Sequence, residues 1–473
     1  MSKKNQSEGN KWLRKAAIII AWLIAWQIIS VCVDNTILLV GPVTTFGVLL
    51  EKVAEISFWK TVLMSIIRII AGFLAGWLLG LLLAAASGWS RMTAFDGQVQ
   101  WVEEALKPIM TLIKTVPVAS FVVLFLIWFR TDVLAVVISM FVVLPNVYFS
   151  TLEGIKNTDT KLLEMASVYE LHPIDKFFYI YRPALKPFWD SCMKLSIGMC
   201  WKSGVAAEVI ATPDFSIGEQ LYMSKIYLNT AGVLAWTVVI ILISTLCEKI
   251  FLKLWGRFLE WQPGCKGVRE AGSVAETQKK DAENAVAVPI AVAAPVISQE
   301  LLCIRDLSKS YGENQLFAKF CAEYKSGHIY YFRAPSGSGK TTLFRMIAGL
   351  EKPDEGQIII NDKIAHCFQE NRLCESYSAL KNLELVCGDA TESYRYLTPL
   401  LDEEDLYKPC CRLSGGMKRR VEVARAFAAK RKVVLLDEPF AGLDEENLRK
   451  MQRYIEEYGK DKAVLIASHV SLD

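Results

Sequence analysis

The sequence predicts a multidomain protein in which an all-α polytopic membrane domain is followed by an α/β domain in water. Hydrophobic residues make up 52% of the 473 residues, yet 22% are charged, a combination that a uniformly soluble chain rarely shows. Apolar segments of membrane-spanning length occur before residue 255, and short apolar strands alternate with helical stretches after residue 300. The expected boundaries are 1–259 for the membrane domain, 260–299 for a flexible linker and 300–473 for the α/β domain.

Six apolar segments are long enough to cross a bilayer, which requires about 20 residues each. They cover residues 16–33, 61–86, 105–129, 132–151, 188–210 and 231–253. The first follows a basic N-terminus and lacks a small-x-small cleavage site, so we interpret it as an anchoring helix rather than a signal peptide. Lysine and arginine favour the N-terminus, the 152–187 loop and the tail after the last span. This bias predicts a multi-pass protein of the cytoplasmic (inner) membrane, with these parts and the α/β domain in the cytoplasm.

Several charged residues interrupt the apolar segments, where charge is costly and usually faces a cavity or a partner. Two interpretations remain open: the side chains line a substrate path, or they form ion pairs between helices and reach toward the span ends. Glycines at four-residue spacing in the second segment predict close helix packing. The charged residues are Arg68, Lys114, Lys194, Lys202 and Glu208, and the glycines are Gly72, Gly76 and Gly80.

Composition argues against some functions. The net charge of +3 gives no reason to expect a nucleic-acid partner. The 12 cysteines form no Cys-x-x-Cys pair and only four histidines occur, which argues against a zinc site. Scattered thiols in the C-terminal half fit a reducing compartment better than a disulfide framework.

The stretch from Arg333 to Thr342 has the character of a phosphate-binding P-loop, because it joins an apolar strand at 329–332 to a helix. Its glycines allow successive backbone N–H groups to face one anion. We therefore expect ATP and Mg²⁺ as ligands, with Lys340 at the β- and γ-phosphates and Thr341 at the metal. The sequence departs from the usual pattern at Ala334, where the first glycine is expected. The residues expected to bind ATP here are Pro335, Ser336, Gly337, Ser338, Gly339, Lys340, Thr341 and Thr342.

A second apolar strand, at 433–436, ends in two carboxylates. We expect Asp437 to hold Mg²⁺ and Glu438 to polarise the water that attacks the γ-phosphate. Between the two phosphate elements, Ser414, Gly415 and Gly416 open a helix and form a further anion-binding turn.

These motifs, with Gln369, Gly442-Leu443-Asp444 and Ser468-His469, occur in the order of the ATPases of ABC transporters, and residues 300–473 resemble that family. The resemblance implies that Tyr311 stacks on adenine and that Ser414 to Gly416 bind the γ-phosphate held by the opposite subunit. A homodimer with two membrane and two ATPase domains is therefore expected. By the same resemblance the catalytic residues are Glu438, His469 and Gln369, and the metal-binding residues are Thr341, Gln369 and Asp437.

Glu164-Met165-Ala166, Glu170 and Ile180-Tyr181-Arg182-Pro183 follow the spacing of the cytoplasmic coupling loop of ABC importers, which the 160–183 loop resembles. Residues 40–255 resemble the permeases of nitrate, sulfonate and taurine importers, on the motifs formed by Ser65, Arg68, Gly72, Phe73, Lys114, Pro117 and Glu208. The resemblance implies ATP-driven uptake of a small anionic or sulfonate-like solute, a membrane-lipid environment and a separate extracytoplasmic substrate-binding protein. We expect the loop to dock near 369–376. Glu170 stands where the family has glycine; we expect it to avoid a left-handed turn and either to cap or to pair with a basic residue such as Arg372. The coupling-loop residues are Glu164, Ala166, Glu170 and Pro183.

Two other functions stay open. An ABC half-exporter also joins six spans to one ATPase, although its membrane domain is longer. An ATP-binding regulatory membrane protein would transport nothing. Ala334, and Met417 where the family usually has glutamine, leave a weak or inactive ATPase possible. The presence of Lys340, Asp437 and Glu438 favours hydrolysis.

Overall fold

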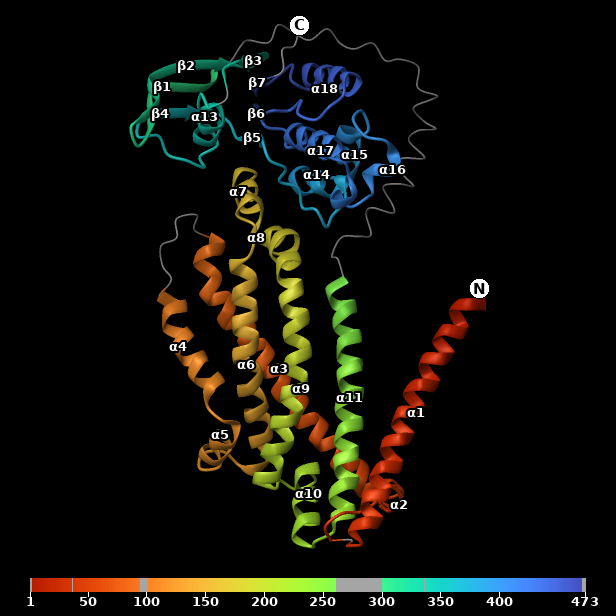
Figure 1. Cartoon of the computed structure of the whole chain (residues 1–473). Coiled ribbons are helices and arrows are strands. Elements are labelled where there is room, and N and C mark those ends of the chain that lie inside the picture. Colours follow the sequence, from red (N-terminus) through yellow and green to blue (C-terminus); the bar gives the residue numbers. More distant parts are fainter. Residues whose placement is uncertain (1, 36, 94–100, 261–299, 336, 470–473) are drawn as a thin grey trace. The chain divides into compact units, whose positions relative to one another are not determined.

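The computed structural model describes residues 2–35, 37–93, 101–260, 300–335 and 337–469, and the chain divides into two compact units (Figure 1). The first unit contains residues 1–157 and 184–261, and the second contains 158–183 and 262–473. The predicted coupling loop thus belongs to the same compact unit as the α/β domain. The predicted linker, apart from residue 260, lies outside the described residues, as does Ser336 of the predicted P-loop.

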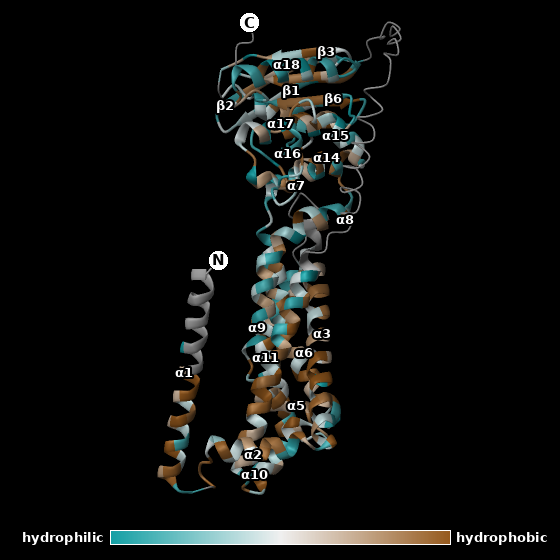
Figure 2. Cartoon of the chain, turned by 90° about the vertical axis from the view of Figure 1, so that its right-hand side faces the viewer, coloured by the Kyte–Doolittle hydropathy of each residue, from teal (hydrophilic) through white to brown (hydrophobic). Residues whose placement is uncertain are grey.

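The first unit is helical throughout its described residues, and hydrophobic residues run along α3, α6 and α11 (Figure 2). Its helices are α1 (Ser2–Val33), α2 (Pro42–Val53), α3 (Ile56–Thr93), α4 (Trp101–Thr115), α5 (Val118–Phe125), α6 (Thr131–Lys156), α9 (from Arg182 to Ala211, its first turn shared with the second unit), α10 (Ile217–Ile226) and α11 (Thr230–Glu260).

Among the described residues, three helical stretches are long and apolar enough to cross a membrane: Ile56–Gly88, Thr131–Lys156 and Thr230–Arg257. Helices α4 and α5 together form a fourth candidate, bent by 98° at the break between them. A shorter apolar stretch covers Ala17–Val33 of α1. Helix α9 occupies the fifth predicted segment, but its charged residues reduce its apolar character. A helical membrane domain is therefore present, and the count of six spans stays a prediction.

The predicted small-residue face lies between α3 and α6. A Cβ atom added at Gly72 would lie 2.4 Å from the backbone oxygen of Val136, and one at Gly76 would lie 2.7 Å from that of Met140. Contacts this short are not possible for a real side chain, so the two helices can approach this closely only with glycine at these positions. The structural interpretation of this glycine face is confirmed.

The second unit contains two sheets. An antiparallel sheet has the strand order β2-β1-β4, and a parallel sheet has the order β3-β7-β6-β5. The strands are β1 (Glu300–Tyr311), β2 (Asn314–Lys325), β3 (His328–Phe332), β4 (Glu355–Ile360), β5 (Ile364–Cys367), β6 (Val433–Asp437) and β7 (Ala463–Ala467). The sequence predicts strands in the apolar runs 329–332, 358–360, 433–436 and 463–467, and these correspond to β3, β4, β6 and β7. It does not predict β1, β2 and β5.

Helices cover both faces of the parallel sheet. Val433 and Leu435 of β6 pack in a core with Phe344, whereas Val434 and Leu436 pack in a second core with the helices after β5. Burial on both faces explains why this strand is an unbroken apolar run. The helices of the unit are α7 (Thr160–Val168), α8 (Pro173–Lys176), α13 (Lys340–Ile347), α14 (Ala379–Cys387), α15 (Ala390–Leu397), α16 (Glu403–Leu406), α17 (Gly415–Ala428) and α18 (Glu445–Tyr458), with a π-helical turn at Phe177–Tyr181 and a 3-10 turn at Cys410–Arg412.

Candidate functional site

The predicted catalytic residues gather at one edge of the parallel sheet. The P-loop follows β3, Gln369 follows β5, Asp437 and Glu438 end β6, and His469 follows β7. All four strands run in the same direction, so their carboxyl ends lie along the same edge. Ligands of open α/β sheets bind at this edge.

The P-loop turns through two glycines in the left-handed region, Gly337 with φ 83° and Gly339 with φ 88°. A Cβ atom at Gly339 would also lie 3.0 Å from the ring of Phe317, so this position excludes a side chain on two grounds. Helix α13 begins directly after it, at Lys340. Lys340 Nζ donates to the backbone oxygens of Ala334 (2.5 Å) and Pro335 (3.2 Å) and lies 3.4 Å from Nε2 of His469.

The two carboxylates at the end of β6 have different partners. Thr341 Oγ1 donates to Asp437 Oδ2 at 2.8 Å, and burial raises the pKa of Asp437 above its ordinary value despite this hydrogen bond. Glu438 has φ 52°, an uncommon conformation for a residue with a side chain. Its Oε2 accepts from the backbone N–H of His469 at 3.3 Å, and its Oε1 lies 3.5 Å from His469 Nε2. The strained backbone thus directs the Glu438 carboxylate toward His469.

These residues fit a nucleotide with Mg²⁺. Ser338 Oγ is buried and has no hydrogen-bond partner among the described residues, which suits a site completed by a phosphate oxygen. Lys340 supplies a cation, and the backbone N–H groups that open α13 supply donors. Thr341 and Asp437 offer adjacent oxygen ligands, the type that Mg²⁺ prefers.

The Ser414–Gly416 turn lies in a different place from the P-loop. It lines an open cavity of about 980 Å³ together with Gln369 and Asp444. Ser414 caps α17 by accepting from the backbone N–H of Met417 at 3.3 Å. In the part of the chain that the structure describes, no hydrogen bond or ion pair joins this turn to the P-loop. If the Ser414–Gly416 turn binds the nucleotide held by the P-loop of another subunit, the turn and the P-loop of one chain must lie apart, as they do here.

Tyr311 ends β1, and its side chain is 50% exposed. Its hydroxyl donates to Glu351, and Lys309 Nζ lies 5.4 Å from the centre of its ring. An exposed aromatic ring beside the P-loop helix is available for stacking on a base, and this assignment stays a prediction.

The predicted coupling loop packs against the ATP-binding part of the second unit. Both oxygens of Glu164 accept from Arg345 of the P-loop helix, Oε1 from Nη2 at 3.0 Å and Oε2 from Nη1 at 3.1 Å. Glu164 also pairs with Arg372, three residues after Gln369. Burial by itself raises the pKa of Glu164, but the hydrogen bonds from both arginines outweigh it, and the pKa lies below its ordinary value. One carboxylate therefore bridges the P-loop helix and the segment after Gln369.

The remaining loop residues are also placed. Ala166 is fully buried in the core that the loop shares with the ATP-binding part, and Pro183 lies in the first turn of α9. For Glu170 the expected pairing with a basic residue is confirmed, whereas the expected conformation and the suggested partner are wrong. Its φ is 53°, in the left-handed region, and its carboxylate pairs with Lys363 rather than with Arg372. The chain turns sharply after α7, so any residue here must adopt this conformation, and Glu170 does so at a cost that glycine would not incur.

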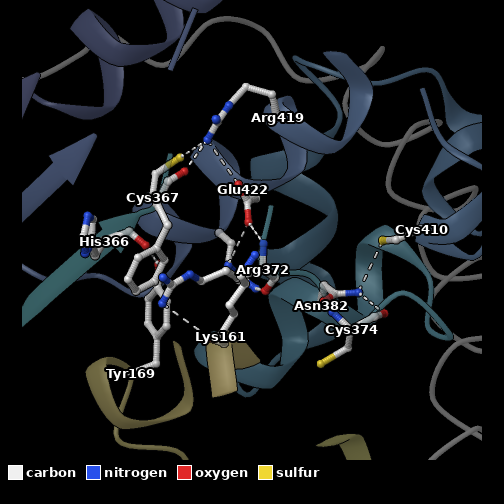
Figure 3. Close-up of polar contacts among 12 residues, drawn as sticks. Lys161, Tyr169, His366, Cys367, Arg372, Cys374, Asn382, Cys410, Arg419 and Glu422 are labelled. Atoms are coloured by element: carbon white, nitrogen blue, oxygen red, sulfur yellow. Dashed lines mark hydrogen bonds and ion pairs between the residues drawn. The ribbon is translucent and has the colours of Figure 1, made fainter. Parts of the chain in front are cut away.

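Next to the loop lies a group of buried charges, which we call the buried charge cluster: Arg372, Arg419, Glu422 and Arg425. Figure 3 shows Arg372, Arg419 and Glu422 of this cluster. Glu422 is fully buried; its Oε2 lies 3.3 Å from Arg419 Nη1, its Oε1 lies 3.5 Å from Arg425 Nη2, and it accepts from the backbone N–H of Arg372. Arg419 also donates to the backbone oxygen of Gln369. The cluster thus fixes the helix of the Ser414–Gly416 turn to the Gln369 segment.

Tyr169 of the coupling loop covers this cluster. Its ring centre lies 5.4 Å from the guanidinium carbon of Arg425, and its hydroxyl donates to the backbone oxygen of His366 at 3.1 Å. Burial raises the pKa of Tyr169 to about 12, so the phenol stays protonated and able to donate. The loop therefore contacts three parts of the domain: the P-loop helix α13, the segment after Gln369, and α17, the helix that the Ser414–Gly416 turn opens.

Comparison with known proteins agrees with this geometry. Residues 78–254 match the family described as binding-protein-dependent transport system inner membrane component, and residues 320–441 match the family described as ABC transporter. The aliphatic sulfonates import ATP-binding protein SsuB of Zymomonas mobilis is 35% identical, over 34% of this chain and 73% of the relative. The chain belongs to the ABC transporter family. It joins an importer-type permease domain to an ABC ATPase domain.

Two other similar proteins show the extent of the match. The sulfate/thiosulfate import ATP-binding protein CysA of Mesostigma viride is 36% identical, over 31% of this chain and 49% of the relative. The ATP-binding cassette MJ0796, solved as a dimer in a post-hydrolysis state with ADP and phosphate, is 27% identical. That match covers 36% of this chain and 88% of the other at a TM-score of 0.34. The chain spans about half the length of several curated relatives that it matches.

Sequence reasoning missed Arg345 and the buried charge cluster. Arg345 lies five residues after Lys340 on a short helix, and nothing in the local pattern marks its distant partner Glu164. The cluster left a readable signal, because Arg419, Glu422 and Arg425 follow each other at three-residue spacing on an otherwise apolar helix face.

Proposed function

We propose that this chain forms a homodimeric ABC importer that takes up a small anionic solute across the cytoplasmic membrane. ATP binding and hydrolysis in the C-terminal domain drive the N-terminal permease. Most of the relatives are named for the import of sulfate, thiosulfate or aliphatic sulfonates, which supports an anionic solute, whereas one is named for the import of Fe(3+) ions. In this proposal all six apolar segments span the membrane, the N-terminus and the ATPase domain are cytoplasmic, and a separate extracytoplasmic binding protein delivers the solute.

The observation that carries this proposal is the double attachment of Glu164. A loop between two helices of the permease contacts, through one carboxylate, both the P-loop helix and the segment after Gln369. These are the two elements that contact the γ-phosphate side of a bound nucleotide. A contact that both sites can bias is what coupling of hydrolysis to transport requires.

In the ATPase step, Lys340 holds the β- and γ-phosphates and Glu438 orients and polarises the attacking water. His469 keeps the Glu438 carboxylate in place through its backbone N–H and contacts the γ-phosphate through its ring. Gln369 senses the attacking water, and Ser414 to Gly416 complete the site of the opposite subunit. Bound Mg²⁺ supplies charge neutralisation at the phosphates, and Thr341, Asp437 and Gln369 are the residues that would hold it.

The test uses the purified full chain in proteoliposomes. Lys340→Ala should abolish nucleotide hydrolysis, whereas Glu438→Gln should retain ATP binding and lose turnover, which traps a closed dimer. Uptake should require ATP on the ATPase side and an added binding protein. Hydrolysis by Glu438→Gln at the parental rate would remove the general-base assignment. Efflux without a binding protein would replace the importer by an exporter.

A further inference from the structure

The charged residues in the apolar segments fall into two groups. Glu208 is fully buried: its Oε2 accepts from Ser65 Oγ at 2.8 Å, and its Oε1 lies 3.9 Å from Arg68 Nη1. Arg68 also donates to the backbone oxygen of Asp214 at 3.0 Å. These two residues pair with each other and fix the turn before α10, so their role is structural.

The three lysines behave differently. Lys114, Lys194 and Lys202 are all exposed, and none forms an ion pair with a carboxylate in the part of the first unit that the structure describes. Lys194 and Lys202 lie on the same exposed stripe of α9 as Leu195 and Met199. Unpaired cations within membrane segments are costly, and they usually mark the path of an ion or substrate.

A cavity of about 330 Å³ lies beside Lys114. Apart from Lys114 and Asn146, its wall is apolar and includes Phe121, Phe141 and Met199. Asn146 is 8% exposed, and its Nδ2 lies 3.7 Å from Met199 Sδ, which joins α6 to α9 in the cavity wall. The volume is at the lower end of the range for small-molecule sites, and a largely apolar wall with a few polar groups is typical of them.

The bend between α4 and α5, which Figure 1 shows, lies at the wall of this cavity. Val116 and Val118, on either side of the break, both line it. The first N–H groups of a helix have no partner inside that helix and carry a partial positive charge. The N-terminal end of α5 therefore adds to the charge of Lys114, and no acidic residue lines the cavity. Broken membrane helices present their N-terminal ends to anionic substrates in other transporters.

We propose that this cavity binds a small organic anion, whose charged head contacts Lys114 and whose short apolar part lies against Phe121 and Phe141. This names the class of solute for the uptake proposed above and rests on that function for the assignment of the occupant as cargo. Lys194 and Lys202 do not line this cavity, although they lie on the same stripe of α9 as Leu195 and Met199, which do.

The test measures the charge preference of the cavity in the full chain without ATP. Val118→Cys places a thiol in the wall, and residues 92–130 contain no native cysteine. Mass spectrometry of peptides from this stretch therefore reads labelling at position 118 alone, with or without Lys114. Anionic and cationic methanethiosulfonate reagents of similar size are compared. Adding Lys114→Gln should lower the anionic-to-cationic rate ratio on the order of tenfold, because one positive charge is removed from the wall. Lys225→Gln removes an exposed lysine of the same unit that does not line the cavity, and it should leave the ratio unchanged.

Protection by a probe tests the occupant with Lys114 intact, so this arm does not depend on the folding of the lysine variant. In Val118→Cys, 1-butanesulfonate should slow labelling, whereas sodium sulfate at equal ionic strength and 1-butanol should not. Equal protection by 1-butanol, protection by sulfate alone, or a rate ratio that ignores Lys114→Gln would each overturn the proposal. Charge-selective labelling and protection in a chain that fails the uptake test would leave this binding site in place and remove the importer function.

Discussion

The contact of Glu164 with Arg345 and Arg372 predicts that Glu164→Gln weakens the docking of the predicted coupling loop on the ATPase domain. Neither the loop nor the domain should unfold. The glutamine has the same shape but loses the charge and one acceptor oxygen. The bidentate contact with Arg345, at 3.0 and 3.1 Å, therefore cannot form in full, and the pairing with Arg372 loses its charge. The buried apolar contacts of Met165 and Ala166 remain, so the loop still docks, with lower stability.

The size of the effect follows from the number and exposure of the bonds. A hydrogen bond to a charged group contributes about 1.5–3 kcal/mol. The side chains of Glu164 and Arg345 are 16% and 30% exposed, so solvent reduces this contribution. We expect a loss of about 2 kcal/mol, which corresponds to about a thirtyfold change in the equilibrium between docked and undocked loop.

Amide hydrogen exchange over α7 measures this equilibrium directly, because exchange there requires local opening of the loop. Protection of residues 160–168 should fall about thirtyfold in Glu164→Gln. Glu170→Gln is the matched control, since it makes the same change in the same loop at a pair with both side chains more than half exposed, Lys363 at 60% and Glu170 at 53%. An exposed pair contributes less than about 1 kcal/mol. Equal loss of protection in both variants would refute the assignment of Glu164 as the main anchor.

Three further predictions follow from particular contacts. The pKa of Glu164 is lowered in the docked loop, so its contribution to docking is present at neutral pH and is lost as the pH falls through and below the ordinary pKa range of a glutamate. Protection of α7, corrected for intrinsic exchange, should fall there in the parent and not in Glu164→Gln. Glu422→Gln should lower the stability of the ATPase domain in thermal unfolding by about 3 kcal/mol, because it leaves buried arginines uncompensated, whereas Glu392→Gln at an exposed pair should have little effect. Gly72→Ala should destabilise the membrane domain in a thermal-aggregation assay by about 1–3 kcal/mol, whereas Gly198→Ala, with open space around it, should not.

The sequence could predict the catalytic edge because its signals are local. An apolar run such as 433–436 is buried on both faces, and the residues that follow it must then lie at the carboxyl edge of the sheet. Strands β2 and β5 escaped prediction for physical reasons. Strand β2 alternates irregularly between half-buried and exposed residues, and β5 has four residues, one of them a histidine. Such segments become strands through pairing with distant partners, and propensity alone does not reveal that.

The coupling loop shows the same limit at the level of single residues. Its pattern located the loop and the segment on which it docks, yet it assigned the wrong partner to Glu170 and no partner to Glu164. The four oxygens of the two carboxylates could equally pair with Lys363, Arg345 or Arg372 as far as the sequence is concerned. The choice depends on which backbone lies beside each residue. Glu164 sits on a helix that faces two arginines, and Glu170 sits on a left-handed turn at the edge of the interface.

The charged residues in the membrane segments differ in the partners that the structure gives them. The sequence alone does not distinguish Arg68 from Lys114, because each is a cation within an apolar stretch. The structure gives Arg68 a buried carboxylate and two backbone carbonyls, which accounts for its charge within the chain. Lys114 lies beside an aromatic ring, 5.5 Å from its Nζ, at the wall of a cavity that no carboxylate lines. A cation that the protein does not neutralise favours an anion from outside, and the proposed solute class rests on that difference.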